Sequence, residues 1–299
     1  MSFPKRVTIV EVGPRDGLQN ESEIIPTPIK IEFIHQLAAA GLSVIEATSF
    51  VSKKWVPALA DGSDVLPALN QHAGVRYPVL VPNETGLNAA LAAGAKDIAV
   101  FTTPSETFSM KNTNCTVADS LARMKTVITQ AKHAGCRVRA YISCVLGCPY
   151  EGDILPDSVA AMAYALMNDG CDEISLGDTI GVGTPGKTLA LLETVMKKVH
   201  RDQLAVHFHD TYGQALVNIY VALQCGIATI DSAVAGLGGC PYAAGASGNV
   251  ATEDVVYLLN GMGIETGVNL EKLIAAGRFI AKKLGHPPRS RVNAAFGDK

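Results

Sequence analysis

Residues 171–210, CDEISLGDTIGVGTPGKTLALLETVMKKVHRDQLAVHFHD, contain the pattern that decides the fold. Short apolar runs at 173–178 and 204–210 flank an amphipathic segment at 185–199, which predicts a strand, a helix and a second strand. A helix that connects two neighbouring strands of one sheet places them parallel to each other. The same alternation continues in both directions along the chain.

The unit occurs eight times in about 260 residues, which predicts an α/β fold, the (β/α)8 TIM barrel. Glycines follow several of the predicted helices and precede the next strand by a few residues, so every strand should enter from the same end. A doubly wound parallel sheet is the alternative. Strands are expected at 6–12, 44–49, 76–81, 97–103, 137–143, 173–178, 204–210 and 229–235, and helices at 27–40, 61–70, 84–93, 117–134, 157–168, 185–199, 214–224 and 252–261.

A single catalytic domain is expected over 1–299, because the composition changes nowhere in a way that marks a linker. The barrel should occupy about 5–262, and an additional C-terminal helix at 270–284 and a tail complete the segment 263–299. The tail from His286, with its proline pair and polar end, is expected to be loosely held.

Composition excludes several classes of partner. Hydrophobic residues make up 48% of the chain, the net charge is −3, and no block of like charge is long enough to bind nucleic acid. No apolar run reaches the roughly 18 residues of a membrane helix, and the N-terminus resembles no targeting signal, so a cytoplasmic protein is expected. The seven cysteines form no Cys-x-x-Cys pair and are expected to be reduced.

Gly181, Gly183 and Gly186 form a G-x-G-x-x-G pattern between a strand and a helix, as in dinucleotide-binding proteins. That fingerprint needs an acidic residue about 20 positions later, at the end of the next strand. The next strand ends in two histidines instead, and Pro185 lacks one N–H that a pyrophosphate would use. The pattern is better explained by a helix start, with Thr184 as N-cap and Pro185 at the first helical position.

Two histidines lie at the end of the seventh predicted strand. His207 and His209 are two residues apart, so both side chains should lie on the same face of the strand. Active sites of such barrels lie at the carboxyl ends of the strands, where Asp16, Asp178 and Asn249 are also expected. These nitrogen and oxygen donors suit a divalent cation. The alternative is that one histidine bonds to a backbone carbonyl and the other is packed.

Arg15-Asp16 follows the first predicted strand. The arginine could stabilise a developing enolate while the carboxylate binds the metal, or the two could form a structural ion pair. Glu11 and Glu46 could accept hydrogen bonds from Arg15 or from ligated waters, or be solvated charges. Asp178 could also be a turn former.

The segment 236–249 contains five glycines in fourteen residues, which favours a mobile lid. Closure of this lid would bring Cys240 near the metal as an acid or thiolate. An adaptable loop with an incidental cysteine is the alternative.

These motifs together resemble one known family. GPRDGLQNE at 13–21, IEATSFVSKKWVPALAD at 45–61, SCVLGCPYEG at 143–152, EISLGDTIGVGTPG at 173–186, HFHDTYGQAL at 207–216 and GLGGCPYAAGASGNVATED at 236–254 are similar to the hydroxymethylglutaryl-CoA lyase family over roughly 5–285. Isopropylmalate and homocitrate synthases share several features, but usually have Asn-Asp after the second histidine where this chain has Asp210-Thr211.

The resemblance implies cleavage of 3-hydroxy-3-methylglutaryl-CoA to acetyl-CoA and acetoacetate, a step of leucine degradation and ketone-body type metabolism. It implies a small-molecule acyl-CoA substrate and a divalent cation, Mg²⁺ or Mn²⁺. A homodimer or higher homo-oligomer is expected. The tail contains no cysteine, so the thiol-based redox control of some family members is not expected here. The implied metal ligands are Asp16, His207, His209 and Asn249.

The resemblance also implies catalytic roles. Arg15 is the electrophile, Cys240 is the lid thiol, and Glu46 and Asp178 are acidic partners of the site. Arg15 and Gln19 are expected to bind substrate. The acceptor of the hydroxyl proton stays open between Asp178 and His207. A condensing acyl-CoA synthase and a metal-dependent scaffold without turnover are the competing functions.

Overall fold

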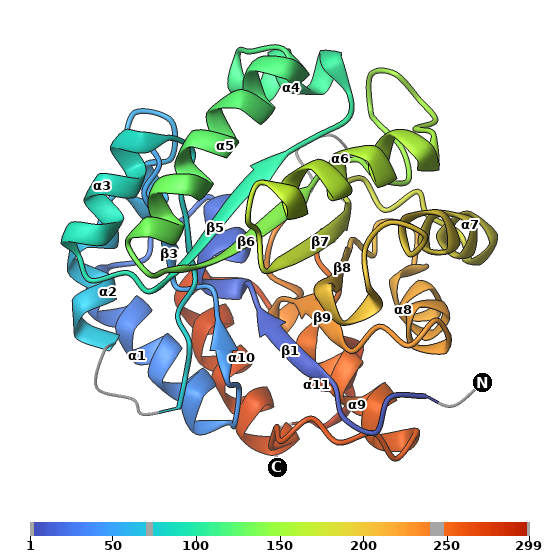
Figure 1. The fold of residues 1–299 in the computed structure, drawn as a ribbon. Coiled ribbons are helices and arrows are strands. Elements are labelled where there is room, and N and C mark those ends of the chain that lie inside the picture. Colours follow the sequence, from blue (N-terminus) through green and yellow to red (C-terminus); the bar gives the residue numbers. More distant parts are fainter. Residues whose placement is uncertain (1–2, 70–73, 240–247, 298–299) are drawn as a thin grey trace.

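A computed structural model describes residues 3–69, 74–239 and 248–297. The predicted parallel sheet is present, with strand order β2-β1-β9-β8-β7-β6-β5-β4-β3, and helices surround it (Figure 1). The strands are β1 (Thr8–Glu11), β2 (Val44–Ile45), β3 (Thr48–Ser49), β4 (Val79–Leu80), β5 (Asp97–Thr102), β6 (Arg137–Ile142), β7 (Glu173–Asp178), β8 (Leu204–Phe208) and β9 (Thr229–Ser232).

The helices follow the strands in the predicted alternation. In the described residues none of them is both long and apolar enough to cross a membrane. They are α1 (Thr27–Ala39), α2 (Gly62–Leu69), α3 (Glu84–Ala92), α4 (Glu106–Thr113), α5 (Val117–His133), α6 (Pro156–Asn168), α7 (Pro185–Val195), α8 (Ala215–Gln224), α9 (Thr252–Gly261), α10 (Leu270–Leu284) and α11 (Arg291–Ala295).

The strand expected at 44–49 consists of two short segments, and these close the barrel. β2 pairs with β1, whereas β3 pairs with β4 at the other end of the strand order. Between them, the backbone N–H of Glu46 donates to Glu11 at 2.8 Å and that of Ala47 donates to Pro78 at 2.9 Å. One continuous stretch therefore bonds to both neighbours, and the eight predicted strands form the barrel.

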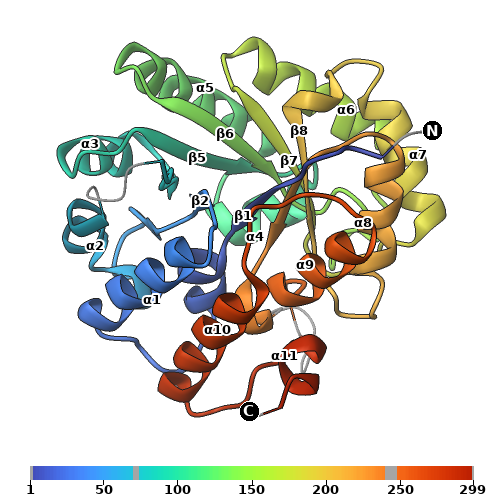
Figure 2. The same cartoon turned by 90° about the horizontal axis from the view of Figure 1, so that it is seen from below.

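The outer helices bury apolar faces against the strands and against one another. Phe33, Ile34 and Leu37 of α1 are fully buried, and α10 packs beside α1 through its own apolar face, which includes Leu273 and Ile280. Figure 2 shows α9, α10 and α11 grouped at one side of the barrel. The additional helix predicted at 270–284 thus has the expected bounds and covers part of the core.

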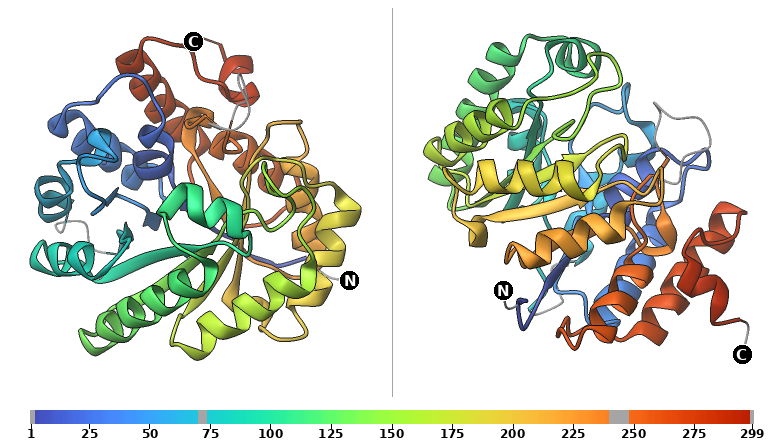
Figure 3. Two further views of the ribbon diagram at one scale, coloured as in Figure 1. Left: turned by 90° about the horizontal axis from the view of Figure 1, so that it is seen from above. Right: turned by 90° about the vertical axis from the view of Figure 1, so that its right-hand side faces the viewer.

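Helix α4 was not expected from the sequence. Its segment ETFSMKNT has no helical apolar periodicity, and local capping defines it instead. The Ser105 side chain accepts a hydrogen bond from the backbone N–H of Phe108, and Asn114 ends the helix in a left-handed conformation with φ of 51°. In the view from above, α4 lies in front of the barrel strands (Figure 3, left). Phe108, Lys111 and Asn112 of this helix line a cavity at the carboxyl ends of the strands.

The prediction that the tail from His286 is loosely held is wrong for its described part. The hydroxyl of Ser290 donates to Asp254 at 2.7 Å, and the backbone N–H of Val292 donates to the same carboxylate at 2.9 Å. Asn293 is buried and donates to Glu253 at 3.0 Å. Acidic side chains of α9 thus supply acceptors for the start of α11, which the proline-rich composition did not indicate.

Candidate active site

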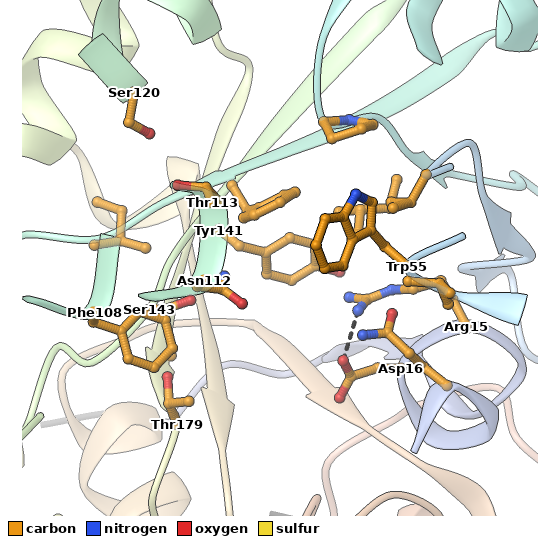
Figure 4. Close-up of a pocket in the computed structure, with 18 of the residues that line it drawn as sticks. Arg15, Asp16, Trp55, Phe108, Asn112, Thr113, Ser120, Tyr141, Ser143 and Thr179 are labelled. Carbon is orange, nitrogen blue, oxygen red and sulfur yellow. Dashed lines mark hydrogen bonds and ion pairs between the residues drawn. The ribbon is translucent and has the colours of Figure 1, made fainter. Parts of the chain in front are cut away.

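A cavity of about 740 Å³ opens at the carboxyl ends of the strands. In Figure 4 the Arg15 and Asp16 side chains face each other on one side of this cavity, with Phe108 and Asn112 on the opposite side. The predicted site residues that line the cavity are Arg15, Asp16, Gln19, His207 and His209.

Arg15 lies in a single π-helical turn, Gly13–Gly17, that follows β1 directly. Its Nε donates to Glu46 Oε2 at 2.7 Å and its Nη1 donates to Asp16 Oδ1 at 2.6 Å. Burial would lower the pKa of Arg15, but the charges of Glu46 and Asp16 raise it above its usual range. Arg15 is therefore a permanently cationic group at the cavity floor, and Glu46 is its buried counter-ion.

In the part of the chain that the structure describes, Glu11 forms no hydrogen bond with Arg15, so that part of the expectation is wrong. Its carboxylate accepts from the backbone N–H groups of Gly13 and Val234 and from the hydroxyl of Thr252. Burial raises the pKa of Glu11 to about 7. Glu11 connects the turn after β1 to the end of β9, which fixes the backbone that carries Arg15.

Asp16, His207 and His209 form a group that could hold a metal ion, with one ligand atom from each lying within 4.8 Å of the others. The His207 and His209 ring centres are 5.5 Å apart, and both rings face the cavity as the spacing of two predicted. His207 Nε2 lies 3.9 Å from Asp16 Oδ2. Asn249 is adjacent, since its Nδ2 donates to the same carboxylate oxygen at 2.8 Å.

The donor chemistry of this group fits a divalent cation. His209 Nδ1 is buried and has no hydrogen-bond partner. Burial, with a smaller contribution from His207, lowers the pKa of His209 to about 4, so the ring is neutral at neutral pH. Burial would raise the pKa of Asp16, but Arg15 and the histidines lower it overall, so the carboxylate is ionised. A carboxylate, two imidazoles and the Asn249 amide supply the mixed nitrogen and oxygen ligands of such a site.

Asp178 lies behind the cavity wall, although the adjacent Gly177 and Thr179 line the cavity. Its carboxylate accepts from the backbone N–H groups of Gly183 at 2.8 Å and Val182 at 3.2 Å. Burial raises its pKa to about 6, against the lowering effect of these hydrogen bonds. The geometry favours the turn-forming alternative, in which Asp178 shapes the G-x-G segment.

The helix start after this turn has the predicted N-cap and the predicted first helical residue. Pro185 occupies the beginning of α7 and Thr184 is the N-cap in extended conformation, but the Thr184 side chain makes no capping hydrogen bond.

Cys240 lies outside the described residues, as does the segment 240–247 of the predicted lid. The described flanks of that segment lie at the active site. Gly239 lines the cavity, and Asn249 contacts Asp16. Arg289 Nη1 donates to the carbonyl of Gly238 at 3.0 Å, which connects one flank to the C-terminal segment.

The cavity lining also includes residues that no sequence motif indicated. Tyr141 lies between two arginines: its ring centre is 5.5 Å from the Arg15 guanidinium carbon, and its hydroxyl accepts from Arg139 at 3.1 Å. Burial raises the pKa of Tyr141 well above its usual range, so it remains a neutral phenol. A tyrosine on the same strand face as a charged residue in the middle of RVRAYI was the available signal.

The outer part of the cavity has a different character. Trp55, the single tryptophan of the chain, is 77% exposed and forms part of one wall. Lys111 of α4 and Arg123 of α5 are cationic residues of the lining. The unpredicted helix α4 explains why Lys111 could not be assigned to the site from its position in the sequence.

A family model described as HMGL-like matches residues 6–280. The mitochondrial hydroxymethylglutaryl-CoA lyase of Arabidopsis thaliana is 61% identical over 294 residues, which is 98% of this chain and 63% of that relative. The chain belongs to the hydroxymethylglutaryl-CoA lyase family. The cytoplasmic 3-hydroxy-3-methylglutaryl-CoA lyase of Rattus norvegicus is 60% identical, with 98% of this chain and 85% of the relative covered.

Solved structures of the hydroxymethylglutaryl-CoA lyase family have the same fold. The crystal structure of the lyase from Pseudomonas aeruginosa has a TM-score of 0.97 and 55% identity, with 99% of each chain covered. An HMG-CoA lyase from Acinetobacter baumannii, solved in complex with coenzyme A and 3-methylmalate, has a TM-score of 0.93 and 35% identity, with 100% of this chain and 97% of that chain covered. The predicted barrel and the predicted family are both confirmed.

Proposed function

We propose that this chain is a divalent-cation-dependent lyase that cleaves 3-hydroxy-3-methylglutaryl-CoA to acetyl-CoA and acetoacetate. One observation supports this most strongly: the buried cation Arg15 is hydrogen-bonded to Asp16, which belongs to the candidate metal-binding group at the cavity floor. A cleavage that generates an enolate next to an alkoxide needs both features side by side. The chain spans 63% of the length of the Arabidopsis relative. The activity of that complete relative is therefore assigned to this chain as a proposal.

The reaction breaks the carbon–carbon bond between the thioester-bearing methylene and the tertiary alcohol carbon. The alcohol loses its proton and becomes the ketone of acetoacetate, while the electron pair of the broken bond forms the acetyl-CoA enolate. A divalent cation such as Mg²⁺ or Mn²⁺ would lower the pKa of the alcohol when bound. The proposed ligands are Asp16, His207, His209 and Asn249, the last through the oxygen of its amide.

Arg15 stabilises the enolate in this proposal. Its guanidinium carries five N–H groups, and the bonds to Glu46 and Asp16 use two of them. Because Arg15 lines the cavity, the remaining N–H groups are available to the thioester oxygen as negative charge develops there. Glu46 holds the guanidinium in place through Nε. Gln19 also lines the cavity, and its buried Oε1 has no hydrogen-bond partner, so Gln19 is proposed to bind substrate.

Two proton transfers complete the proposal. Asp178 is proposed to shape the 179–183 loop rather than to accept the hydroxyl proton, since its oxygens bond to backbone N–H groups. His207 Nδ1 faces Asp231 and Nε2 faces Asp16, so a His207 that binds the cation cannot also be the base. The hydroxyl proton then passes to a water molecule in the open cavity. Cys240 is proposed to protonate the enolate carbon, and its thiolate then regains a proton from the water that accepted the hydroxyl proton.

The coenzyme A arm is proposed to lie in the outer part of the cavity. Lys111 and Arg123 would attract its phosphates, and Trp55 offers an exposed aromatic face to its adenine. The structure of the Acinetobacter baumannii lyase with coenzyme A supports this class of ligand for the family.

The cellular setting is also proposed. The reaction would serve leucine degradation and ketone-body type metabolism in the cytoplasm, carried out by a homodimer or higher homo-oligomer of one catalytic domain over 1–299. Relatives are named as mitochondrial and as cytoplasmic.

A substrate comparison tests the function. Incubation with 3-hydroxy-3-methylglutaryl-CoA and Mg²⁺ should release acetoacetate, whereas acetyl-CoA plus 2-oxoisovalerate should give no condensation product. Condensation without cleavage would establish the synthase alternative, and inactivity in both assays with retained cation binding would establish the scaffold alternative.

A further inference from the structure

We propose that Asp231 is a positioning residue that fixes the orientation and the tautomer of His207, so that the Nε2 lone pair of His207 faces the cation site. This inference rests on the cation site of the proposed function. It extends the site to the next strand, to a residue that lies outside both the cavity lining and the metal-binding group.

The first observation is a direct contact between neighbouring strands. His207 of β8 and Asp231 of β9 are register partners in the sheet. His207 Nδ1 lies 3.2 Å from Asp231 Oδ2, while His207 Nε2 points to the other side, 3.9 Å from Asp16 Oδ2. The two ring nitrogens therefore have different partners, and only Nε2 faces the metal-binding group.

The second observation is the environment of Asp231, which is 1% exposed inside the barrel. Its Oδ1 is 2.5 Å from Arg139 Nη2, and its Oδ2 accepts from the hydroxyl of Ser175 at 2.7 Å. An arginine at this distance keeps the carboxylate ionised, and an ionised carboxylate can only accept hydrogen bonds. In the hydrogen bond between His207 Nδ1 and Asp231 Oδ2, the proton is therefore carried by Nδ1. The unprotonated Nε2 is then the ligand atom.

His209 provides a contrast within the same group. Its Nδ1 is buried without a hydrogen-bond partner, so no carboxylate selects its tautomer through that atom. Both histidines face the same cavity and are equally buried. Any effect that runs through Asp231 should therefore appear at His207 and not at His209.

A purely structural role for Asp231 would be to neutralise Arg139. Arg139 has a second acidic partner, since its Nε lies 2.7 Å from Glu173 Oε1. Removing the charge of Asp231 consequently leaves Arg139 paired, and Asp231→Asn should fold. In that variant Arg139 would bond to the amide oxygen, so the amide NH2 would face His207 and favour the tautomer protonated at Nε2.

The test combines two readouts that need no substrate. In protein labelled with ¹⁵N-histidine and treated with a chelator, NMR shifts recorded at a pH at which the His207 ring carries a single proton should show that proton on Nδ1. In Asp231→Asn that proton should move to Nε2, with the His209 signals unchanged. The Kd for Mn²⁺, measured by electron paramagnetic resonance, should rise about 10- to 100-fold, as for the loss of other partners of metal-binding histidines.

Glu173→Gln is the matched control, because it removes a buried carboxylate that touches Arg139 but not His207. Its Mn²⁺ Kd should remain within about threefold of the parent. A parent His207 protonated at Nε2 would overturn the proposal without any variant, and so would a folded Asp231→Asn protein with the parent's Kd. Failure to form acetoacetate would contradict the proposed function and leave both of these readouts intact.

Discussion

Arg15 Nη1 and Asp16 Oδ1 are 2.6 Å apart, so two consecutive residues of one π-helical turn hold opposite charges at the floor of the cavity. The two side chains have separate tasks in the proposed reaction: one stabilises the enolate, and the other binds the cation. Because they are hydrogen-bonded, a change in one also alters the position of the other.

Arg15→Gln tests the electrophile. The substitution removes the fixed charge at the enolate oxygen, so kcat should fall by about 10²- to 10³-fold, the typical effect of losing one stabilising donor. Steady-state kinetics with saturating Mg²⁺ measure it. Arg76→Gln is the control, since Arg76 forms a partly exposed ion pair with Asp97 away from the cavity lining, and it should retain kcat within a few-fold. An Arg15→Gln enzyme with near-parent kcat would reduce Arg15 to a structural ion-pair partner.

Trp55 tests the location of the coenzyme A arm. Trp55 is the single tryptophan of the chain, so the tryptophan fluorescence of the protein comes from this residue alone. That fluorescence should change when coenzyme A is added. Trp55→Ala should weaken coenzyme A binding about fivefold, the effect of roughly 1 kcal/mol of stacking on a base. Tyr257→Ala removes an exposed aromatic side chain of α9 instead and should have no effect. Unaltered fluorescence at saturating coenzyme A would place the arm elsewhere.

Cys240→Ser tests the proposed proton donor. A hydroxyl is a much weaker acid than a thiol, so the variant should bind cation and substrate normally but lose most of its turnover. In the parent, alkylating agents should label Cys240 before the buried cysteines, and substrate should protect it. Mass spectrometry identifies the labelled residue. Preferential labelling elsewhere, with near-normal turnover of the serine variant, would leave water as the donor.

The raised pKa of the buried Glu253 side chain predicts that the stability of the fold depends on pH. Burial raises the pKa of Glu253 from 4.5 to about 8 in the folded protein, where it accepts from the backbone N–H of Ala235 and from Asn293. A raised pKa means that the folded state retains a proton that the unfolded state loses. The stabilisation is complete below pH 4.5 and is lost as the pH rises through about 8.

The melting temperature should therefore fall between pH 5 and pH 8 for this reason. Glu253→Gln should make that slope shallower, with part remaining because burial also raises the pKa of Glu11. Thermal unfolding from pH 5 to pH 9 measures the slope. Glu271→Gln, an exposed change in α10, should leave it unaltered. Equal slopes in the parent and in Glu253→Gln would contradict the account.

The barrel was predictable because short buried strands alternate with amphipathic helices along the whole sheet. β7 and α10 have their expected bounds, and the closing stretch 44–49 differs only in its division into two segments. α4 was missed because a serine cap and a left-handed asparagine define it instead of apolar periodicity. Such local features are set by hydrogen bonds that no spacing rule specifies.

The residues of the candidate site were predictable where their position on a strand determines which way the side chain faces. The His207 and His209 pair faces the cavity because side chains two apart share one face. The partners of Glu11 and Asp178 were not predictable, since both bond to backbone N–H groups of turns. Asp231 was not predicted because it lies within a short, mostly buried strand, where a charged residue indicates a buried hydrogen-bond network only once its neighbours are known.

The most direct test of the central claim is to measure whether product formation depends on the divalent cation. With 3-hydroxy-3-methylglutaryl-CoA and Mg²⁺ or Mn²⁺, acetyl-CoA and acetoacetate should appear in equal amounts, and a chelator should abolish both until the cation is restored. Asp16→Asn, which retains the size of the side chain, should shift the concentration of cation needed for half-maximal rate upward by at least about tenfold. Full activity after exhaustive chelation, with metal absent by elemental analysis, would contradict the assignment of Asp16, His207 and His209.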